Sequence, residues 1–347
     1  MLAQSGYEVS LIAVHDKTVL EDNVKIVGIP KPRGRFGRMT GTAWNIFLAA
    51  LRERADIYHI HDAELLPWGQ VLRLLGKRVI FDMHENLVED IRTKAWLPPA
   101  IASAVGWIFK CFAPCLLANM PIIFAENSYV KYYPYVKRSV VLLNMPILDR
   151  LLQVSEPKNA EFTLGYFGSV AESRGSLNTL RAMRILKERG YKIAYECVGP
   201  VSEAHRREIL NLASECELGE VRLHGYLRPE EGWRLMARSH LGLAVLLPKP
   251  NYFESYPTKL FEYMALGLPV VVSDFPLYRE VVSTADCGLY VNPENPVALA
   301  DAIERLITNP SCASKYGENG RRSVQKQYNW KTESSKLLKF YEDMLRS

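Results

Sequence analysis

The stretch Asn251–Ser273 reads NYFESYPTKLFEYMALGLPVVVS, and it decides how the rest of the chain is expected to fold. After a polar and aromatic loop, Pro257 suits the first turn of a helix, and the residues that follow repeat apolar side chains at three- and four-residue spacing. Gly267 is suited to end this helix in the left-handed conformation. The β-branched run Val270–Val272 then predicts a strand buried on both faces of a parallel sheet. The stretch therefore predicts a helix followed by a strand, as in an α/β domain.

Two glutamates bracket the start of this helix. Glu254 lies in the loop and Glu262 lies one turn inside the helix, with seven residues between them. Helical side chains lean toward the N-terminus, so Glu262 leans back over the first turn, where unpaired backbone amides attract anions. A nucleotide diphosphate sugar needs amides for phosphate, a carboxylate for ribose hydroxyls and a second carboxylate for the sugar. Two solvated glutamates on a surface helix are the alternative that spacing alone leaves open.

The same stretch resembles the donor-site signature of glycosyltransferase family 4, the retaining group 1 glycosyltransferases. The matching residues are Glu254, Pro257, Lys259, Leu260, Glu262, Tyr263, Met264, Ala265, Gly267, Pro269 and Val270. The resemblance implies an α/β fold of the GT-B type, with two Rossmann-like domains facing each other across a cleft that holds the active site. It also implies retaining transfer of a sugar from a nucleotide diphosphate sugar, without a metal ion.

Length and composition agree with a two-domain globular protein. The 347 residues are 48% hydrophobic and 23% charged, and the net charge of +5 predicts neither a nucleic-acid nor a membrane partner. The six cysteines include no CxxC pair and favour a reducing cytosol. We therefore expect a cytoplasmic protein, with the inner face of the cytoplasmic membrane as a second location, and no nucleic-acid partner.

The beginning of the chain departs from the family pattern. Met1–Ser5 predicts the end of a helix and Val9–Val14 predicts a strand. In the resembled family an opening strand, a glycine-rich loop and most of a helix precede this point. We therefore expect the first domain, residues 1–150, to lack that strand and loop, through either truncation or divergence.

Polar residues lie at the carboxyl ends of two neighbouring strands predicted in the first domain, Asp56–His61 and Arg78–Met83. Ligands of doubly wound sheets collect at such carboxyl ends. The polar residues are His61, Asp62, His84 and Glu85. The sequences HDAELLP and FDMHE resemble the first domain of the family, and the resemblance implies that His84 contacts the transferred sugar. Asp62 and Glu85 are the candidates for the acceptor side.

Two segments of the first domain could contact a membrane. Lys31–Arg38 carries four basic residues and two glycines, and Trp96–Asn119 is rich in apolar and aromatic residues. A solvated loop and a core helix pair are the alternatives left open. The prolines of the second segment argue against a spanning helix. We expect peripheral membrane contact through Lys31–Arg38 and Trp96–Phe112, which would suit a polyprenyl-linked or glycan acceptor.

The second domain, residues 151–327, restarts the α/β alternation. The predicted strand Phe162–Phe167 ends in Gly168 and Ser169, and Arg174 precedes the next helix. The family places Gly-Arg and then Lys-Gly here, and its two basic residues bind the diphosphate. Arg174 takes the second basic place, and Ser169 stands in the first, so one phosphate contact is weaker or comes from elsewhere.

Further along, a predicted strand leads into Gly225, Tyr226 and Leu227, where the family's backbone holds the base of the nucleotide. Ile193–Val198 and Glu280–Thr284 are expected as further strands, and Pro296–Thr308 is expected as a helix. Residues 328–347 are expected to form a helix that crosses back to the first domain.

These observations and the family resemblance suggest a role for each candidate residue in binding the donor. Glu262 would bind ribose hydroxyls, Arg174 the diphosphate, Glu254 the donor sugar and the positive charge at its anomeric carbon, and His84 the sugar. Sugar and phosphates would be framed by the residues at the helix start, which are Tyr256, Pro257, Thr258 and Lys259. No cofactor or metal is expected, because helix N-termini and Arg174 would neutralise the diphosphate and the sequence has no Asp-x-Asp motif.

The expected function is metal-independent retaining transfer from a UDP- or GDP-linked sugar in bacterial surface polysaccharide synthesis. The alternatives are a nucleotide-sugar epimerase or a phosphorylase on the same fold, and a non-catalytic or truncated subunit that binds nucleotide sugar. A phosphorylase would need a lysine for pyridoxal phosphate, and the sequence singles none out.

Overall fold

The computed structural model describes residues 1–32, 34–88, 91 and 98–346. The chain divides into two compact units, one made of Met1–Leu143 and Glu333–Ser347 and the other of Asn144–Thr332. The second unit begins before residue 151 because Leu151 is fully buried and Arg321 donates a hydrogen bond to the Leu152 carbonyl at 2.6 Å. The boundary expected between residues 150 and 151 therefore lies inside the second unit.

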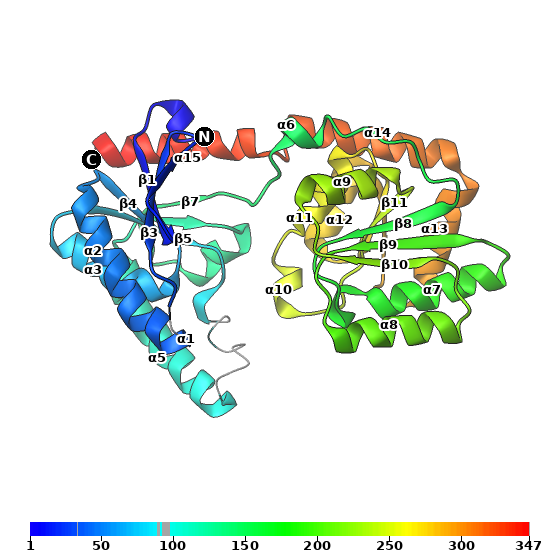
Figure 1. Ribbon diagram of the computed structural model, residues 1–347, viewed down its shortest axis with the longest axis horizontal. Helices are drawn as coiled ribbons and strands as arrows, with labels where there is room; N and C mark the ends of the chain where they lie inside the picture. Colours follow the sequence, from blue (N-terminus) through cyan, green and yellow to red (C-terminus); the bar gives the residue numbers. More distant parts are fainter. Residues whose placement is uncertain (33, 89–90, 92–97, 347) are drawn as a thin grey trace. The chain divides into compact units, whose positions relative to one another are not determined.

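A six-stranded sheet, parallel in every pairing, organises the second unit, in the order β10-β9-β8-β11-β12-β13. Figure 1 shows β10, β9, β8 and β11 in this order. Its strands are β8 (Phe162–Phe167), β9 (Ile193–Val198), β10 (Val221–Gly225), β11 (Leu241–Ala244), β12 (Val270–Ser273) and β13 (Gly288–Val291). The strands expected at 162–167 and 193–198 are confirmed at both ends. The chain moves outward from β8 in one direction and from β11 in the other, as in a doubly wound fold.

Helices cover both faces of this sheet. The described helices are α6 (Leu148–Leu151), η5 (Glu172–Arg174), α7 (Ser176–Glu188), α8 (Glu203–Glu215), α9 (Pro229–Arg238), α10 (Pro250–Phe253), α11 (Thr258–Ala265), α12 (Pro276–Ala285), α13 (Pro296–Thr308) and α14 (Pro310–Lys326). Residues of α7, α8 and α13 form one apolar core with the strands. On the other side α9 contacts β8, α11 contacts β11, and α12 contacts β12.

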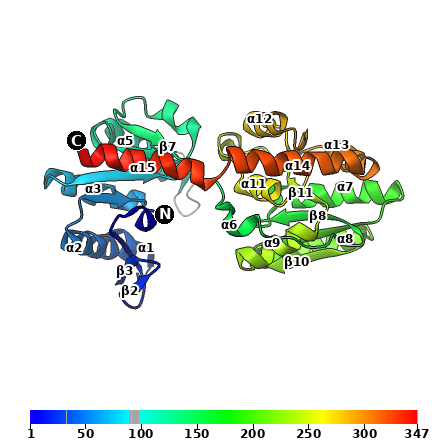
Figure 2. The ribbon, with the colours of Figure 1, turned by 90° about the horizontal axis from the view of Figure 1, so that it is seen from above.

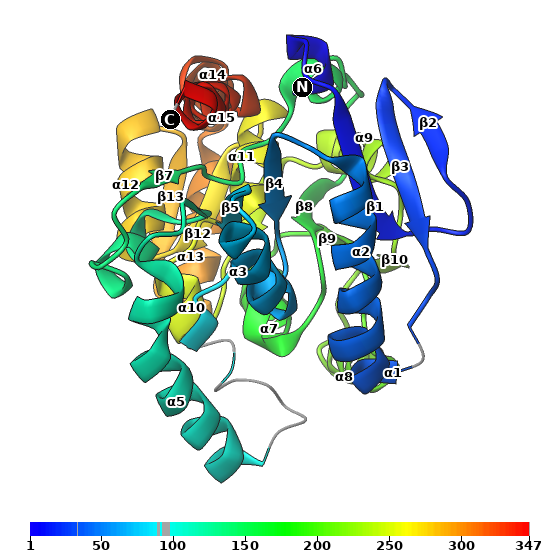
Figure 3. The same ribbon diagram turned by 90° about the vertical axis from the view of Figure 1, so that its left-hand side faces the viewer.

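The first unit contains two sheets. The order β4-β5-β6-β7 is parallel throughout, and the order β1-β3-β2 combines a parallel pair with an antiparallel hairpin (Figure 3). The strands are β1 (Val9–Val14), β2 (Val19–Glu21), β3 (Val24–Ile29), β4 (Ile57–Ile60), β5 (Arg78–Met83), β6 (Ile122–Phe124) and β7 (Ser139–Val141). The hairpin at β2 was not expected, although Asp22 and Asn23 tolerate the positive φ of 49° and 62° that its turn requires.

The described helices of the first unit pack around these sheets. They are η1 (Ala3–Ser5), α1 (Gly34–Gly37), the π-helical turn η2 (Arg38–Thr42), α2 (Ala43–Glu53), η3 (Ala63–Leu65), α3 (Leu66–Leu74), α5 (Pro99–Leu117), η4 (Asn127–Tyr132) and, from Glu333 onward, α15 (Trp330–Arg346). Figure 2 shows α15 running alongside β7. Its buried residues Leu337, Phe340 and Tyr341 form one apolar cluster with Ile80 and Ile123.

Three expectations for local structure are corrected. The loop expected before Pro257 contains the short helix α10. The strand expected at Glu280–Thr284 lies inside α12, because Pro276 begins a helix that continues to a left-handed cap at Asp286. Lys31–Arg38 contains α1 and the first residue of η2. Arg33 lies outside the described residues.

Helix α5 is continuous, although prolines were expected to break this segment. Pro114 lies inside the helix, and the Ala118 amide donates to the Pro114 carbonyl at 3.0 Å. By length and composition Ala100–Leu117 could cross a membrane, and 22% of this window is buried. Its exposed apolar side chains are Ile101, Val105, Trp107, Ile108 and Phe112. Trp96 and Leu97, which the membrane prediction included, lie outside the described residues.

Candidate functional site

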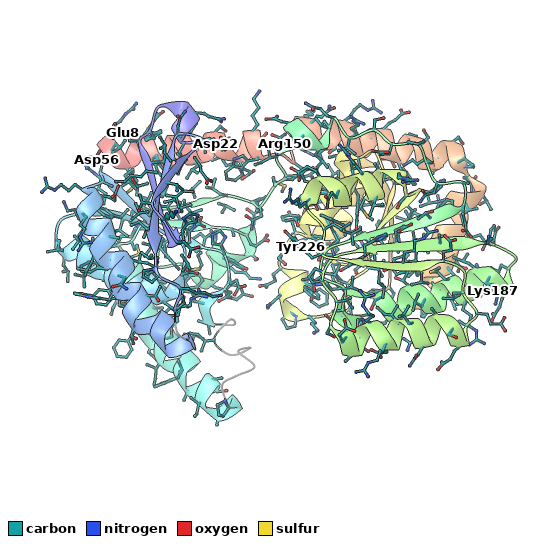
Figure 4. All side chains as sticks on the ribbon, viewed as in Figure 1. Glu8, Asp22, Asp56, Arg150, Lys187 and Tyr226 are labelled. Carbon is teal, nitrogen blue, oxygen red and sulfur yellow. The ribbon has the colours of Figure 1, made fainter. Side chains whose placement is uncertain are left out.

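The candidate site lies where β8 and β11 are neighbours in the sheet of the second unit. The chain leaves these two strands in opposite directions, and ligands of open parallel sheets bind outside the carboxyl ends at such a point. The loops that follow β8 and β11 meet there. The Leu247 amide donates to the Ser173 carbonyl at 2.9 Å, and the hydroxyls of Ser173 and Tyr252 are 3.4 Å apart. Figure 4 shows Tyr226 at this end of the sheet and Lys187 at the opposite end.

Two glycines let the backbone turn tightly in the loop after β8. Gly168 has φ +121°, and a Cβ atom there would lie 3.2 Å from Lys259 Nζ. Gly175 has φ +81°, and a Cβ atom there would lie 1.9 Å from the Val245 carbonyl oxygen. Since other residues would be strained or would clash, the loop keeps its backbone close to β11 and to α11.

Arg174 and the start of α7 belong to this same loop. Gly175 precedes α7, which begins at Ser176 and runs for 13 residues, so its first amides open onto the loop. The guanidinium carbon of Arg174 is 5.9 Å from the ring centre of Tyr252. A positive side chain and the positive end of a helix are thus next to each other, which favours an anion such as a diphosphate.

Lys259 is a buried basic side chain beneath the loop. Its ammonium donates to the Tyr166 hydroxyl at 2.7 Å, and 5% of the residue is exposed. Burial, with the charge of Arg174 as a second cause, lowers the pKa of Lys259 well below its ordinary value, while Glu262 opposes the shift. An anion bound at the Gly168 turn would therefore stabilise the charged form of Lys259.

Glu262 lies on α11, beside Lys259. Its Oε1 accepts a hydrogen bond from the indole N–H of Trp233 on α9 at 3.0 Å. Burial raises the pKa of Glu262, and the Trp233 bond and the Lys259 charge oppose this shift. The Trp233 bond thus fixes the orientation of the carboxylate, while burial makes its charged form less favourable than in water.

The other residues predicted for donor binding lie at the start of α11, just before it, or after neighbouring strands. Glu254 directly follows α10 and is half-buried. Pro257 precedes α11 and its carbonyl accepts from the Leu260 amide at 2.9 Å, and Thr258 is exposed in the first turn. The ring of Tyr256 lies 5.9 Å from that of Phe261.

Two further predictions concern the strand ends. Ser169 is exposed, and its carbonyl accepts from the Tyr166 hydroxyl at 2.8 Å. Tyr226 and Leu227 follow β10, and Tyr226 is 76% exposed. The Gly199 amide donates to the Gly225 carbonyl at 2.7 Å, which joins the ends of β9 and β10.

Sequence reasoning missed Tyr166, Trp233 and Tyr252 as parts of this site. Tyr166 and Trp233 contact predicted residues 93 and 29 positions away, so no short motif contains both partners. Tyr166 had one usable signal, since it lies two residues before the glycine turn at the end of a predicted strand. Tyr252 lies in the opening stretch, two residues before Glu254, whereas Trp233 had no signal.

In the first unit the predicted residues divide into two groups. Asp62 pairs with Arg38 at 3.4 Å, and Arg38 also reaches Glu64 at 3.2 Å. His84 lies elsewhere, with Nε2 3.2 Å from Nδ1 of His61. Glu85 is exposed beside it in sequence.

His59 and Asp82, which were not predicted, complete the group around His84. Each imidazole places a ring nitrogen 3.3 to 3.4 Å from Asp82 Oδ2. Burial alone would raise the pKa of Asp82, but the three histidines hold it well below its usual range. Alternation could have revealed this group, because residues two apart on a strand share a face.

A cavity of about 420 Å³ lies elsewhere in the second unit. It is lined by Glu161 and Thr163 around the start of β8, together with Glu196, Arg222 and Arg238. Because these residues lie away from the carboxyl ends of the strands, the cavity is not part of the candidate site.

The chain matches two family models. Residues 149–323 match the model described as Glycosyl transferases group 1, and residues 1–119 match the model described as Glycosyltransferase Family 4. The first match includes every residue of the candidate site, from Tyr166 to Glu262.

Curated relatives match parts of the chain. A phosphatidyl-myo-inositol mannosyltransferase of Mycobacterium leprae is 34% identical over 94 residues, which is 27% of this chain and 25% of the relative. The capsular polysaccharide biosynthesis glycosyltransferase CapM of Staphylococcus aureus is 21% identical over 195 residues, which is 54% of this chain and 48% of the relative. The matched segments thus span a quarter to about half of the length of these relatives.

Solved structures match nearly the whole chain in fold. Sucrose-phosphate synthase from Thermosynechococcus elongatus has a TM-score of 0.76 at 19% identity, covering 99% of this chain and 91% of the other. Anabaena HepE in complex with UDP-glucose has a TM-score of 0.69 at 14% identity, covering 92% and 86%. At these identities the likeness concerns the fold.

Proposed function

The chain belongs to the group 1 glycosyltransferases of family 4, and from this premise we propose that it transfers a sugar from a nucleotide diphosphate sugar to a hydroxyl group of an acceptor. The observation that carries the proposal is the convergence of three positive groups on one loop of the second unit. These are Arg174, the N-terminus of α7 and the buried amino group of Lys259, whose charged form a bound anion would stabilise. Such a loop suits a diphosphate.

The diphosphate would bind at the loop Gly168–Gly175. Ser169 stands where the family has a basic residue, and Lys259 supplies a second cation from α11, with Nζ close to Gly168. Arg174 supplies planar donors that can bind two phosphate oxygens. With the amides of α7 these groups would neutralise the leaving diphosphate, so the proposed transfer needs no metal ion.

The nucleoside would lie beside the diphosphate. Glu262, oriented by Trp233, would accept hydrogen bonds from ribose hydroxyls. The backbone at Tyr226 and Leu227 would hold the base. The nucleotide is UDP or GDP, and UDP is favoured because HepE, which shares the fold, was solved with UDP-glucose.

The proposed chemistry is retaining transfer. Glu254 would stabilise the positive charge that builds at the anomeric carbon as the bond to the phosphate breaks. The leaving phosphate oxygen would accept the proton of the acceptor hydroxyl on the same face of the sugar. The acceptor is a glycan or a lipid-linked glycan, and the likeness to the capsular polysaccharide transferase CapM supports a role in surface polysaccharide synthesis.

Calorimetric titration with UDP and GDP in the presence of a chelator tests the binding step. One nucleotide should bind saturably, and its sugar should be consumed when extracts rich in acceptor are added. Replacing Glu254 by Ala should abolish turnover and preserve nucleotide binding and the melting temperature. Turnover in this variant would contradict the role of Glu254, and a chain that binds neither nucleotide would overturn the proposal.

A lipid-linked acceptor would also explain α5. We propose that its exposed face, with Trp107 64% and Phe112 61% exposed, docks on a bilayer. Flotation with anionic liposomes should capture the chain, and replacing both residues by Ser should release it. Leu74, which is 87% exposed on α3, gives the matched control, because its replacement by Ser should leave capture unchanged. Equal capture of all three proteins would refute docking through α5.

A further inference from the structure

Three polar side chains of α7 and α8 form a chain of hydrogen bonds that begins next to the loop Gly168–Gly175. The hydroxyl of Ser176, the first residue of α7, lies 2.7 Å from Nε2 of His205 on α8. Nδ1 of His205 in turn lies 2.8 Å from Oε2 of Glu208, which is three residues further along α8. We call Ser176, His205 and Glu208 the relay.

The relay is buried at the end that meets the loop and open to solvent at the other. Ser176 is 3% exposed and the side chain of His205 is 11% exposed, whereas the side chain of Glu208 is 51% exposed. The backbone amide of His205 also donates to the hydroxyl of Ser202, which caps α8, at 3.2 Å. Because water does not compete for the bond between Ser176 and His205, each of the two side chains fixes the other.

Ser176 connects the relay to the turn that carries Arg174. Its hydroxyl donates to the Ala171 carbonyl at 3.1 Å, and the Arg174 amide donates to the same carbonyl at 2.9 Å. A serine hydroxyl has one proton and can also accept hydrogen bonds. When Ser176 donates to Ala171 it therefore accepts from His205, so the histidine holds the hydroxyl that closes the turn.

The first turn of α7 has no capping side chain of its own. Gly175 occupies the cap position with φ +81° and offers no side-chain acceptor to the amides of that turn. Helices α8 and α13, by contrast, are capped by the side chains of Ser202 and Asn295. The amides at the start of α7 can therefore serve an anion, and their direction depends on what holds Ser176.

Helix α8, which carries His205, is itself fixed in the second unit. Its Ile209 is fully buried in the apolar core that α7 shares with the strands. The segment before α8 is also joined to the loop after β8, since the Val170 amide donates to the Pro200 carbonyl at 2.9 Å and Val170 forms a bridge with Val201. The relay thus links the loop to a part of the molecule that is already packed.

Ser176, His205 and Glu208 have the residue types that hydrolases use as a nucleophile, a base and an acid that orients the base, and their distances would allow this. The hydroxyl of Ser176, however, is bonded to both His205 and Ala171, and at 3% exposure its oxygen is not open to a substrate. The relay therefore acts on the backbone and not on a reacting bond.

We propose that the relay positions the start of α7 and the turn of Arg174 for the diphosphate of the donor, with His205 as its central positioning residue. This inference rests on the proposed function, because it needs a diphosphate at this loop. A first turn that is already held in place loses less conformational freedom when the anion binds, so the relay should increase affinity without touching the nucleotide.

The test uses the full chain and whichever of UDP and GDP the parent binds. His205→Ala and Ser176→Ala should each weaken its binding about 10-fold in calorimetry, because both break the relay. His205→Gln should stay within about 2-fold of the parent, since its amide can still bond the Ser176 hydroxyl. Lys187→Met is the matched control and should bind as the parent does. Lys187 donates to the Cys216 carbonyl at 3.3 Å and to Glu217 at 2.9 Å, so it joins the same two helices, but at the opposite end of the sheet (Figure 4).

The 2′-deoxy form of the nucleotide separates positioning from general damage to the site. His205→Ala should weaken the ribonucleotide and the deoxyribonucleotide equally, because the ribose contact proposed for Glu262 is not part of the relay. Three results would overturn the relay alone: undiminished affinity in His205→Ala, a His205→Gln variant as weak as His205→Ala, or loss of the preference for ribose in His205→Ala. A parent chain that binds neither nucleotide would overturn the proposed function and the relay together.

Discussion

Replacing Glu262 by Gln tests the proposed ribose contact with little disturbance of the fold. The side chains have nearly the same shape, and the amide oxygen can keep the 3.0 Å bond from Trp233. Burial raises the pKa of Glu262, so the native state gains little from this charge and the variant should melt within a few degrees of the parent. What the variant loses is a negative acceptor for ribose hydroxyls.

The expected loss of affinity follows from the strength of charged hydrogen bonds. A bond to a charged group contributes about 1.5 to 3 kcal/mol, and a neutral bond contributes about 1 kcal/mol. The difference of about 0.5 to 2 kcal/mol corresponds to a dissociation constant about 2-fold to 30-fold weaker. Because the contact goes to ribose, the loss should be similar for the nucleotide and for its sugar.

Calorimetry with the nucleotide and with its 2′-deoxy form measures this effect. The parent should prefer the ribonucleotide. Glu262→Gln should lose most of that preference, because the substitution and the missing 2′-hydroxyl both remove the contact between Glu262 and the ribose. Glu254→Gln is the matched control and should keep it. Equal affinity of parent and Glu262→Gln for the ribonucleotide, or an undiminished preference in the variant, would refute the assignment.

Other predictions concern the supports of the same site. Lys259→Met should weaken nucleotide binding about 10-fold or more by calorimetry, since a charged phosphate contact is lost; unchanged affinity would remove Lys259 from the site. Trp233→Phe should weaken binding about 3-fold to 10-fold because Glu262 loses its orienting bond, and a drop in melting temperature instead would indicate a packing role. Gly175→Ala should lower the free energy of unfolding, measured in urea, by more than about 2 kcal/mol, because its Cβ would meet the Val245 carbonyl. Gly190→Ala should lower it by about 1 kcal/mol, because Gly190 has φ +91° but open space around it. Equal losses in the two variants would contradict the predicted clash at Gly175.

The second unit was largely predictable because its signals are local. The apolar strand Ile193–Val198 and the helix Pro296–Thr308 are confirmed at both ends, since turn residues and capping residues bound them in the sequence. Gly267 has the expected left-handed conformation, with φ +71°. Short-range patterns therefore placed the elements that carry the site.

Side-chain partners were not predictable in this way. The sequence singles out Lys259, but nothing near it indicates that its ammonium turns inward to Tyr166. Likewise the sequence gives Glu262 a role without revealing Trp233 as its donor. Such contacts depend on how α9 and α11 pack on the sheet, which a one-dimensional pattern does not contain.

In the first unit, by contrast, the sequence contains a pattern that predicts neighbouring side chains, namely the alternation of residues along two paired strands. His84 was singled out by resemblance to a family, and His61 by its place after a strand. Alternation along β4 and β5 would have added His59 and Asp82, because both strands pair in parallel and in register. Reading the strand pair as one surface would have predicted the whole cluster.

The opposite pKa shifts of Lys259 and Glu262 predict how nucleotide affinity depends on pH. Burial lowers the pKa of Lys259 and raises that of Glu262, so each group is closer to losing its charge in the free protein. A diphosphate favours charged Lys259, and ribose hydroxyls favour charged Glu262. Affinity should therefore fall in acid, as Glu262 is protonated, and fall again in alkali as Lys259 loses its proton. Titration across pH should show the acid limb missing in Glu262→Gln and the alkaline limb missing in Lys259→Met. A profile with the same two limbs in all three proteins would show that other groups control binding.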